Sequence, residues 1–425
     1  MKPSGIEWIG DIPDDWEVTK IGQLYLERNE KVSDREYEAL SVTKRGILKQ
    51  LESAAKTDNG DNRKLVKSGD FVINSRSDRR GSCGISKFDG SVSLINIILM
   101  PTQKIANGYY NYLFRTENFA DEFYKYGNGI VDDLWSTKWT SMKKILVPFP
   151  SLRTQQRIAD YLDEKCGEID ATIAKQKESI EKLKAYKQSL ISETVTKGLD
   201  KSAPLKPSGI EWIGDIPSHW EIKKLKYVAK LDPTISEFLS DNDIVSFAPM
   251  ECLGEQTLSP YETEYGKVKG KYTYFANEDI IMAKVTPCFE NGNIAIAKNL
   301  KNNVGFGSSE LFVFRTKSVS NSFLMYTLYS EPFKSLAKST MYGTGGLKRV
   351  SPNFILDYKI PLPPLKTQES IADYLESKCS QIDKYITEKQ NIIQKLDAYK
   401  KSLIFECVTG KCSILGEICN GRRAK

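Results

Sequence analysis

The 425-residue chain is almost without histidine, since His219 is the only one. A single imidazole argues against a zinc site built on paired histidines and leaves a Ser-His-Asp relay one candidate base. The eight cysteines form no Cys-x-x-Cys pair and lack the dense spacing of a secreted disulfide scaffold. We therefore expect reduced thiols in a cytoplasmic protein, and most hydrolase mechanisms are disfavoured.

Long apolar runs and nucleotide loops are also missing. No stretch approaches the roughly 18 uninterrupted apolar residues of a membrane helix, and the opening MKPSGIEWIGDIP has no signal-peptide apolar region. The phosphate-loop pattern Gly-x-x-x-x-Gly-Lys-Ser/Thr occurs nowhere. The sequence therefore predicts neither a membrane protein nor a P-loop nucleotide-binding protein.

What the chain does have is a literal internal repeat. Residues 2–17 read KPSGIEWIGDIPDDWE, residues 206–221 read KPSGIEWIGDIPSHWE, and 14 of the 16 positions are identical. A second pair follows, with TQQRIADYLDEKCGEI at 154–169 and TQESIADYLESKCSQI at 367–382. Repeated segments in the same order indicate two copies of one structural plan.

Each copy ends in a predicted long helix. Apolar or tolerated residues recur at spacings of three, four and seven, which is typical of a coiled-coil seam. The seam residues are Ile158, Leu162, Cys166, Ile169, Ile173, Ile180, Leu183 and Leu190 in the first copy, and Ile371, Leu375, Cys379, Ile382, Ile386, Ile393, Leu396 and Leu403 in the second. We predict an antiparallel coiled coil with pseudo-two-fold symmetry, whose helices of about 42 residues would each span roughly 60 Å.

The segments between the repeats are predicted to be globular. They mix β-branched and aromatic runs, such as FVINS and ELFVFRT, with amphipathic stretches and Gly-Asn-Ser turns, as α/β domains do. The predicted parts are a first globular domain at 1–152, a long helix at 153–199, a second globular domain at 200–365, a long helix at 366–411 and a loosely ordered tail at 412–425.

Positive charge is concentrated in the globular segments. The chain has 61 Lys and Arg against 55 Asp and Glu, a net charge of +6. Residues 154–198 contain eight basic and eight acidic residues, and residues 367–411 contain seven of each. Because both helices are neutral, any polyanionic partner should bind the globular domains.

In the first globular segment, the loop at 74–87 combines arginines with Ser and Gly. The arginine fork fits both guanine edges and phosphates, although a solvated surface loop is an equal alternative. The candidate DNA-binding residues of this segment are Lys44, Arg45, Arg76, Arg79, Arg80, Lys87 and Lys138. Trp135 and Trp139, which flank Lys138, are favoured as core anchors.

In the second segment, two Gly-rich basic stretches stand out. In VTPCFENGN (285–293), Glu290 could accept a hydrogen bond from cytosine and Asn291 could pair with adenine. In GTGGLKRV (343–350), Lys348 and Arg349 could approach a phosphate backbone. Together these stretches favour a nucleic-acid partner.

Catalysis by this chain is a weaker hypothesis. Acid-x-Lys triplets occur at 163–165 and 357–359, as chance predicts in so charged a chain. The counterpart of His219 in the first copy is Asp15, so the repeated plan does not require the imidazole.

The opening repeat contains Trp8 with Trp16 and Trp212 with Trp220, which either pack locally or form a docking surface presented twice. We favour local packing for Trp16 and Trp220, and keep Trp8 and Trp212 as candidate partner-binding residues.

With these motifs in this order, the chain resembles the DNA-specificity subunit of type I restriction-modification systems over nearly its whole length. The motifs are PSGIEWIGDIPxxW at 3–16 and 207–220, PLPPLKTQESIADYLESKCSQID at 361–383 with its partner at 148–170, and the second-domain strings FAPMECLG, KVTPCFENGN, FGSSELFVFR and GTGGLKRVS. The first globular segment matches the family pattern only loosely, so its candidate contacts depend on charge alone.

The resemblance implies a non-catalytic subunit with two target-recognition domains. Each would read half of a bipartite, asymmetric target in double-stranded DNA, and the coiled coil would set the unread gap. The expected partners are two modification subunits, which carry S-adenosylmethionine and methylate adenine, and restriction subunits that combine motor and nuclease. No cofactor is expected in this chain. The family pattern places second-domain DNA contacts on Lys284, Thr286, Glu290, Asn291, Lys348 and Arg349.

Two rival interpretations remain. A scaffold without DNA would explain the helices but not the basic loops. A stand-alone nuclease would cut DNA as the purified chain with a metal ion, and would lose that activity on substitution of Asp357.

We expect Arg349→Ala to weaken binding to target DNA, because a base-edge or phosphate contact is removed. Binding to target and random duplexes at moderate salt measures the effect. Unchanged affinity and selectivity would contradict the assignment of Arg349.

Overall fold

In the computed structural model the chain forms two compact units. The residues described are 1–50, 60–102, 104–129, 135–235, 238–344 and 346–412. Unit 1 comprises Met1–Gln176 and Gln390–Lys425, and unit 2 comprises Lys177–Lys389. Each unit therefore joins one globular part to a portion of both long helices. The predicted tail lies, from residue 413, outside the described residues, and the predicted domain boundaries stay predictions.

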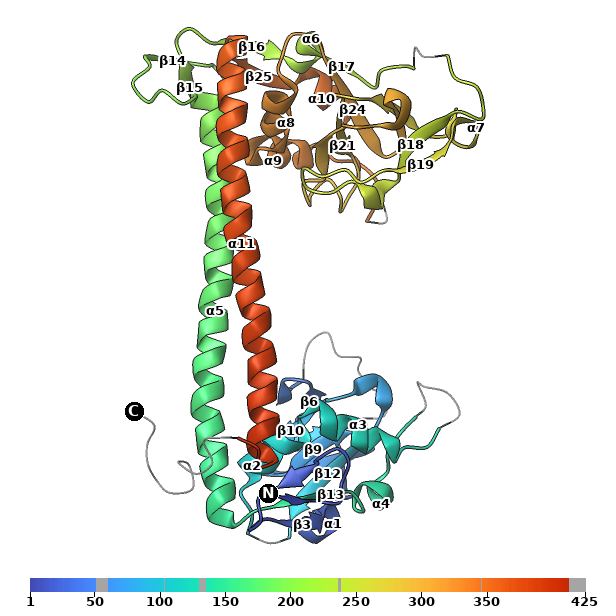
Figure 1. Ribbon diagram of the computed structural model, residues 1–425, viewed down its shortest axis with the longest axis vertical. Helices are drawn as coiled ribbons and strands as arrows, with labels where there is room; N and C mark the ends of the chain where they lie inside the picture. The colour runs from blue at the N-terminus through green and yellow to red at the C-terminus, as the bar shows by residue number, and fades with distance from the viewer. Residues whose placement is uncertain (51–59, 103, 130–134, 236–237, 345, 413–425) are drawn as a thin grey trace. The chain divides into compact units, whose positions relative to one another are not determined.

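The globular part of unit 1 is a mixed α/β structure (Figure 1). Its strands are β1 (Lys2–Pro3), β2 (Asp11–Ile12), β3 (Glu17–Lys20), β4 (Tyr25–Glu27), β5 (Lys31–Val32), β6 (Leu40–Thr43), β7 (Gly46–Lys49), β8 (Arg63–Val66), β9 (Phe71–Asn74), β10 (Cys83–Ile85), β11 (Gly90–Val92), β12 (Asn96–Pro101) and β13 (Leu146–Phe149). Its helices are α1 (Ile21–Leu24), α2 (Asn107–Phe114), α3 (Glu117–Lys125) and α4 (Trp139–Met142), followed by the long α5 (Leu152–Lys197).

The globular part of unit 2 has a similar order of elements, with an additional short helix, α7, between its strands. Its strands are β14 (Leu205–Pro207), β15 (Asp215–Pro217), β16 (Glu221–Lys224), β17 (Ala229–Leu231), β18 (Ile244–Ala248), β19 (Tyr261–Glu264), β20 (Thr273–Ala276), β21 (Ile280–Ala283), β22 (Ile294–Ile296), β23 (Val304–Gly307), β24 (Leu311–Thr316) and β25 (Lys359–Leu362). Its helices are α6 (Leu225–Val228), α7 (Tyr265–Val268), α8 (Asn321–Tyr329), α9 (Glu331–Ser339) and α10 (Pro352–Asp357), followed by the long α11 (Leu365–Val408).

The central sheets of the two units have the same topology. The strand order is β10-β9-β12-β4 in unit 1 and β22-β21-β24-β17 in unit 2, and all pairs within both sheets are antiparallel. The middle strands β9 and β21 are buried at every position, as expected for strands covered on both faces. Two segments that look unlike in sequence therefore share the same central sheet, and the predicted α/β class and internal repeat are confirmed.

Aromatic packing fills the core of unit 1 between the central sheet and the helices α2 and α3. Phe114 packs on Phe71, with ring centroids 5.0 Å apart, and on Phe119 at 4.6 Å. Tyr110 lies edge-on to Tyr25 at 6.1 Å. These buried rings each remove a large apolar area from water, so they dominate the stability of the domain.

The long helices pair antiparallel in each unit, as predicted. In unit 1 Lys400 bonds to Asp170 at 2.6 Å, and in unit 2 Lys187 bonds to Asp383 at 2.9 Å. Predicted seam residues that are buried are Ile158, Leu162, Cys166, Ile169, Ile173, Ile180, Ile371, Leu375, Cys379, Ile382 and Leu403. The other predicted members, Leu183, Leu190, Ile386, Ile393 and Leu396, are half-buried.

The C-terminal end of each long helix packs on a copy of the opening repeat. In unit 2, Gly198 has φ +74°, and a Cβ there would lie 2.9 Å from the ring of Trp220. In unit 1, a Cβ on Gly410, at φ +79°, would lie 3.3 Å from the ring of Trp16. The same contact is thus made twice, and in unit 1 it joins the first residues of the chain to the end of α11.

Further hydrogen bonds hold the end of α11 in unit 1. The Tyr109 hydroxyl donates to the carbonyl of Val408 at 2.7 Å. The Lys411 ammonium group donates to the carbonyl of Ile9 at 2.6 Å. The first bond satisfies a carbonyl at the helix C-terminus, which has no partner within the helix, and the second ties the residue just after α11 to the opening repeat.

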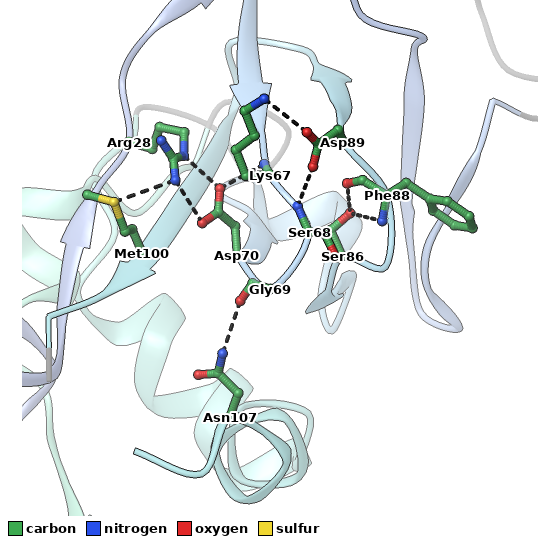
Figure 2. Close-up of polar contacts among 10 residues, drawn as sticks. All are labelled: Arg28, Lys67, Ser68, Gly69, Asp70, Ser86, Phe88, Asp89, Met100 and Asn107. Carbon is green, nitrogen blue, oxygen red and sulfur yellow. Dashed lines mark hydrogen bonds and ion pairs between the residues drawn. The ribbon is translucent and has the colours of Figure 1, made fainter. Parts of the chain in front are cut away.

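Both globular parts contain the same buried aspartate turn before the middle strand of the central sheet. Asp70 accepts hydrogen bonds from the Lys67 amide at 2.9 Å and from Arg28 at 2.7 and 3.2 Å (Figure 2). In unit 2 Asp279 accepts from the Ala276 amide at 2.7 Å and from Arg315 at 2.8 and 2.7 Å. The aspartate side chains are 4% and 2% exposed, so both carboxylates depend on these donors.

We expect Asp70→Ala and Asp279→Ala each to lower the free energy of unfolding by about 2–4 kcal/mol, because each leaves an arginine without its partner and a turn amide unbonded. Urea denaturation followed by tryptophan fluorescence measures the change. The matched control is Asp89→Ala, whose side chain is 53% exposed and should matter little. Equal midpoint shifts for all three variants would contradict this assignment.

Candidate nucleic-acid interface

Four of the residues predicted to contact DNA in the second domain are brought together. The chain leaves β21 through Lys284 and Thr286, and this segment pairs with residues 348–350: the Thr286 amide donates to the Lys348 carbonyl at 2.9 Å, and the Val350 amide donates to the Lys284 carbonyl at 2.9 Å. Arg349 in turn exchanges two backbone hydrogen bonds with Tyr342, at 2.8 and 3.0 Å. The result is a small three-stranded frame, 284–286, 348–350 and 342, at one end of the central sheet.

The Thr286 hydroxyl fixes the Gly-rich loop of this frame. It donates to the Gly346 carbonyl at 2.7 Å and accepts from the Lys348 amide at 3.0 Å. Gly343 has φ +131°, and a Cβ there would collide with the Leu347 carbonyl, so only glycine suits this position. The loop is thereby held with the Lys348 side chain exposed.

The polar side chains of this region differ in whether another side chain of the protein already binds them. Arg349 makes two hydrogen bonds of 2.8 Å to Glu310, and these bonds lower the pKa of the Glu310 carboxyl. Glu290 bonds to Lys338 at 2.6 Å, and the ammonium group of Lys284 lies 5.4 Å from the centre of the Phe312 ring. Asn291 and Lys348 are exposed. Glu290 and Arg349 therefore have protein partners that DNA would have to replace.

In unit 1 the basic loop after β9 pairs with the segment before α4. The Ser77 amide donates to the Trp135 carbonyl, and the Thr137 amide to the Ser75 carbonyl, both at 3.0 Å. Asp78 lies 3.4 Å from Arg76 and 3.5 Å from Arg79, so it is shared between two guanidinium groups. Arg80 forms an ion pair with Asp121, an opposing acid that the loop sequence alone did not reveal.

The other predicted basic residues of unit 1 lie in different places. Lys44 and Arg45 form the exposed turn between β6 and β7, where Arg115 donates to the Lys44 carbonyl at 2.8 Å. Lys138 is exposed at the start of α4, next to the basic loop. Lys87 follows β10 and lies near the Asp70 end of β9, whereas Arg76 follows the opposite end. The structure thus groups Arg76, Arg79, Arg80 and Lys138 but separates Lys87 from them.

The opening-repeat tryptophans pack against their own domains. Trp8 is 9% exposed and lies edge-on to Phe119 at 6.0 Å. Trp212 is half-buried and stacks on Tyr358 at 4.9 Å. Trp16 and Trp220 are buried. The burial of Trp8 leaves little of its indole for a partner, while Trp212 keeps an accessible face; partner binding by either stays a prediction.

The candidates for catalysis are engaged in other contacts. The ammonium groups of Lys226 and Lys224 each bond to Asp357 at 2.9 Å and lower the pKa of its carboxyl to about 2. His219 is exposed, with its ring edge-on to Trp220. Within the described ranges, no three His, Cys, Asp or Glu side chains gather as metal ligands would.

Among the residues that the structure describes, no helix combines the length and the apolar character of a membrane span.

Sequence reasoning missed two exposed residues at the second-domain frame: Tyr342, which belongs to it, and Leu347, on the loop beside it, are 57% and 55% exposed. Tyr342 pairs with Arg349, and Leu347 directly precedes the exposed Lys348. The signal was available, because Leu347 lies within the Gly-rich stretch that the sequence singled out and Tyr342 directly precedes it.

Comparison with known families gives two matches along the chain. The family described as type I restriction modification DNA specificity domain matches residues 13–184 and 217–398. The specificity subunit of the type I restriction enzyme EcoEI of Escherichia coli is 33% identical over 53% of this chain and 38% of its own length. The specificity subunit of the type I restriction enzyme EcoAI, also of Escherichia coli, is 35% identical over 57% of this chain and 39% of its own length. This chain thus spans about two fifths of the length of these two relatives.

Another relative and two solved structures match over nearly their whole length. The specificity subunit of the type I restriction enzyme MjaVIII of Methanocaldococcus jannaschii is 26% identical over 95% of this chain and 94% of its own. A solved structure concerning complex assembly and conformational transition of the type I R-M system has a TM-score of 0.71 at 15% identity, covering 95% of this chain and 100% of that one. The HsdS subunit from Thermoanaerobacter tengcongensis has a TM-score of 0.54 at 16% identity, covering 95% and 98%. These structures share the fold.

Comparing Arg349→Ala with Glu310→Ala separates two roles of the arginine. If the guanidinium group binds DNA, Arg349→Ala weakens binding by about 5- to 100-fold, whereas Glu310→Ala frees the same group and preserves or strengthens binding. Affinity for the target duplex at fixed salt is the measurement. Equal weakening by both variants would mean that the pair acts only by holding the loop.

Proposed function

We propose a function from the premise that this chain belongs to the family of type I restriction modification DNA specificity domains. The chain would be the sequence-specific DNA-recognition subunit of a type I restriction-modification complex. Its two globular parts would each read one half of a bipartite, asymmetric target in double-stranded DNA. The observation that carries this proposal is that both units hold basic residues on the same pattern of paired segments beyond the equivalent strands β9 and β21. In unit 1 Arg76 follows β9 and pairs with Ser136, and in unit 2 Val285 follows β21 and pairs with Arg349.

The chemistry of the frame suits DNA. Lysines such as Lys138 and Lys348, exposed beside the frame, can neutralise phosphates and give salt-dependent affinity. Arginine and amide side chains such as Arg79 and Asn291 can read base edges in the major groove. Phosphate contacts would position each domain, and a small number of base contacts would specify the sequence.

The parts that differ between the two units and the parts that match would have different roles. Different loops on the two units allow two different half-sites to be read. Matching opening repeats and helices offer equal docking surfaces, which suits two copies of one modification subunit. The paired helices would set the number of unread base pairs between the half-sites.

Catalysis and cofactor binding would belong to the partners. The modification subunits would carry S-adenosylmethionine and methylate adenine, and restriction subunits would join for cleavage. The candidate nuclease residue Asp357 is neutralised by two lysines, which disfavours a catalytic role for it.

We expect a new bipartite methylation motif when this chain is produced with the methyltransferase encoded beside it. Every methylated adenine of the host DNA is mapped by single-molecule sequencing. A motif with two half-sites and a fixed gap is expected, and exchange of residues 222–363 for those of a relative should change only one half-site. No new methylation from a complex that assembles and binds S-adenosylmethionine would contradict the proposal and favour a scaffold.

A further inference from the structure

The frames of the two units match bond for bond, although their residues differ. In unit 2, Val285 pairs antiparallel with Arg349, which pairs antiparallel with Tyr342. In unit 1, Arg76 pairs in the same way with Ser136, which pairs with Asn128. The flanking hydrogen bonds correspond too: Asn128 and Ser136 exchange two bonds of 2.9 and 3.1 Å, as Tyr342 and Arg349 do in unit 2.

This register defines a row of three residues in each unit. The row is Arg76, Ser136 and Asn128 in unit 1, and Val285, Arg349 and Tyr342 in unit 2. Residues directly opposite one another on neighbouring strands present their side chains close together. Each row contains one arginine held by an acid, through Asp78 at 3.4 Å in unit 1 and Glu310 at 2.8 Å in unit 2.

The outer member of each row is exposed and differs between the units. Asn128 is exposed, and Tyr342 is 57% exposed. Both side chains lie on the third segment of the frame, three residues after the helix α3 or α9. A fixed backbone with a variable exposed side chain at one position is what two readers of different sequences require.

We infer that Asn128 and Tyr342 are equivalent base-reading residues that determine the specificity of the first and second half-sites. This inference deepens the proposed function and depends on it. The carboxamide of Asn128 matches the donor and acceptor pair of an adenine edge in the major groove. The Tyr342 ring offers an apolar face to a thymine methyl group and a hydroxyl that both donates and accepts. The arginine of each row, held by its acid, belongs to the same backbone frame that presents Asn128 or Tyr342.

The test uses Asn128→Ala and Tyr342→Ala in the complete complex with its modification subunits, with methylated adenines mapped as for the wild type. Asn29→Ala and Tyr227→Ala are matched controls, because Asn29 is exposed and Tyr227 is 66% exposed, each outside the frame of its unit. Each test variant should relax one base pair in its own half-site, with about 5- to 100-fold less discrimination. The other half-site and the gap should stay unchanged, and the controls should keep the wild-type motif.

The outcomes distinguish the inference from the proposed function. A wild-type motif retained by both test variants at normal rates overturns the inference alone. If the wild-type complex produces no methylation motif, the proposed function is overturned and the inference falls with it. If a variant complex assembles but does not methylate, binding to duplexes changed at single base pairs decides: lost preference in one half-site supports the inference, and unchanged preference overturns it.

Discussion

The packing of each long helix end against an opening repeat is the contact on which the architecture depends. In unit 2 this is the contact of Gly198 with Trp220, which are close in sequence; in unit 1 Gly410 meets Trp16 from the other end of the chain. Because the last turn of α11 belongs to the core of unit 1, that core is complete only when the C-terminal part of α11 is packed against it. The burial of Val408 and Trp16 in one apolar cluster therefore links the folding of the first domain to the second helix.

Charge is used in two ways within each domain. Buried aspartates such as Asp70 and Asp279 fix the turn before the middle strand. Their arginines come from different places, since Arg28 directly follows β4 whereas Arg315 lies in β24. The strand beyond that turn ends in the frame, where ion pairs are more exposed, as for Arg349 at 38%. The buried aspartate and the proposed DNA contacts thus lie at opposite ends of the same strand, so the loops proposed to read DNA can differ while the core is kept.

The sequence predicted what repetition and periodicity encode. Identical opening segments and seam spacing were sufficient for two α/β copies with antiparallel helices, because those contacts are made by the same residues twice. The shared frame could not be predicted, since backbone hydrogen bonds leave no trace in residue identity. The Tyr-Gly pairs at 126–127 and 342–343 would align Tyr126 with Tyr342, whereas the structure aligns Asn128 with it. Charge alone also grouped Lys87 with Arg76, which the antiparallel strands β9 and β10 keep apart.

The central claim is that two equivalent frames contact the two half-sites of one target. The most direct measurement places a photo-crosslinking amino acid at position 128, 342 or 87 and identifies the linked nucleotide in a bound duplex. The account predicts cross-links from positions 128 and 342 to bases of opposite half-sites, and none to bases from position 87. Base cross-links from position 87, with none from 128 and 342, would contradict it.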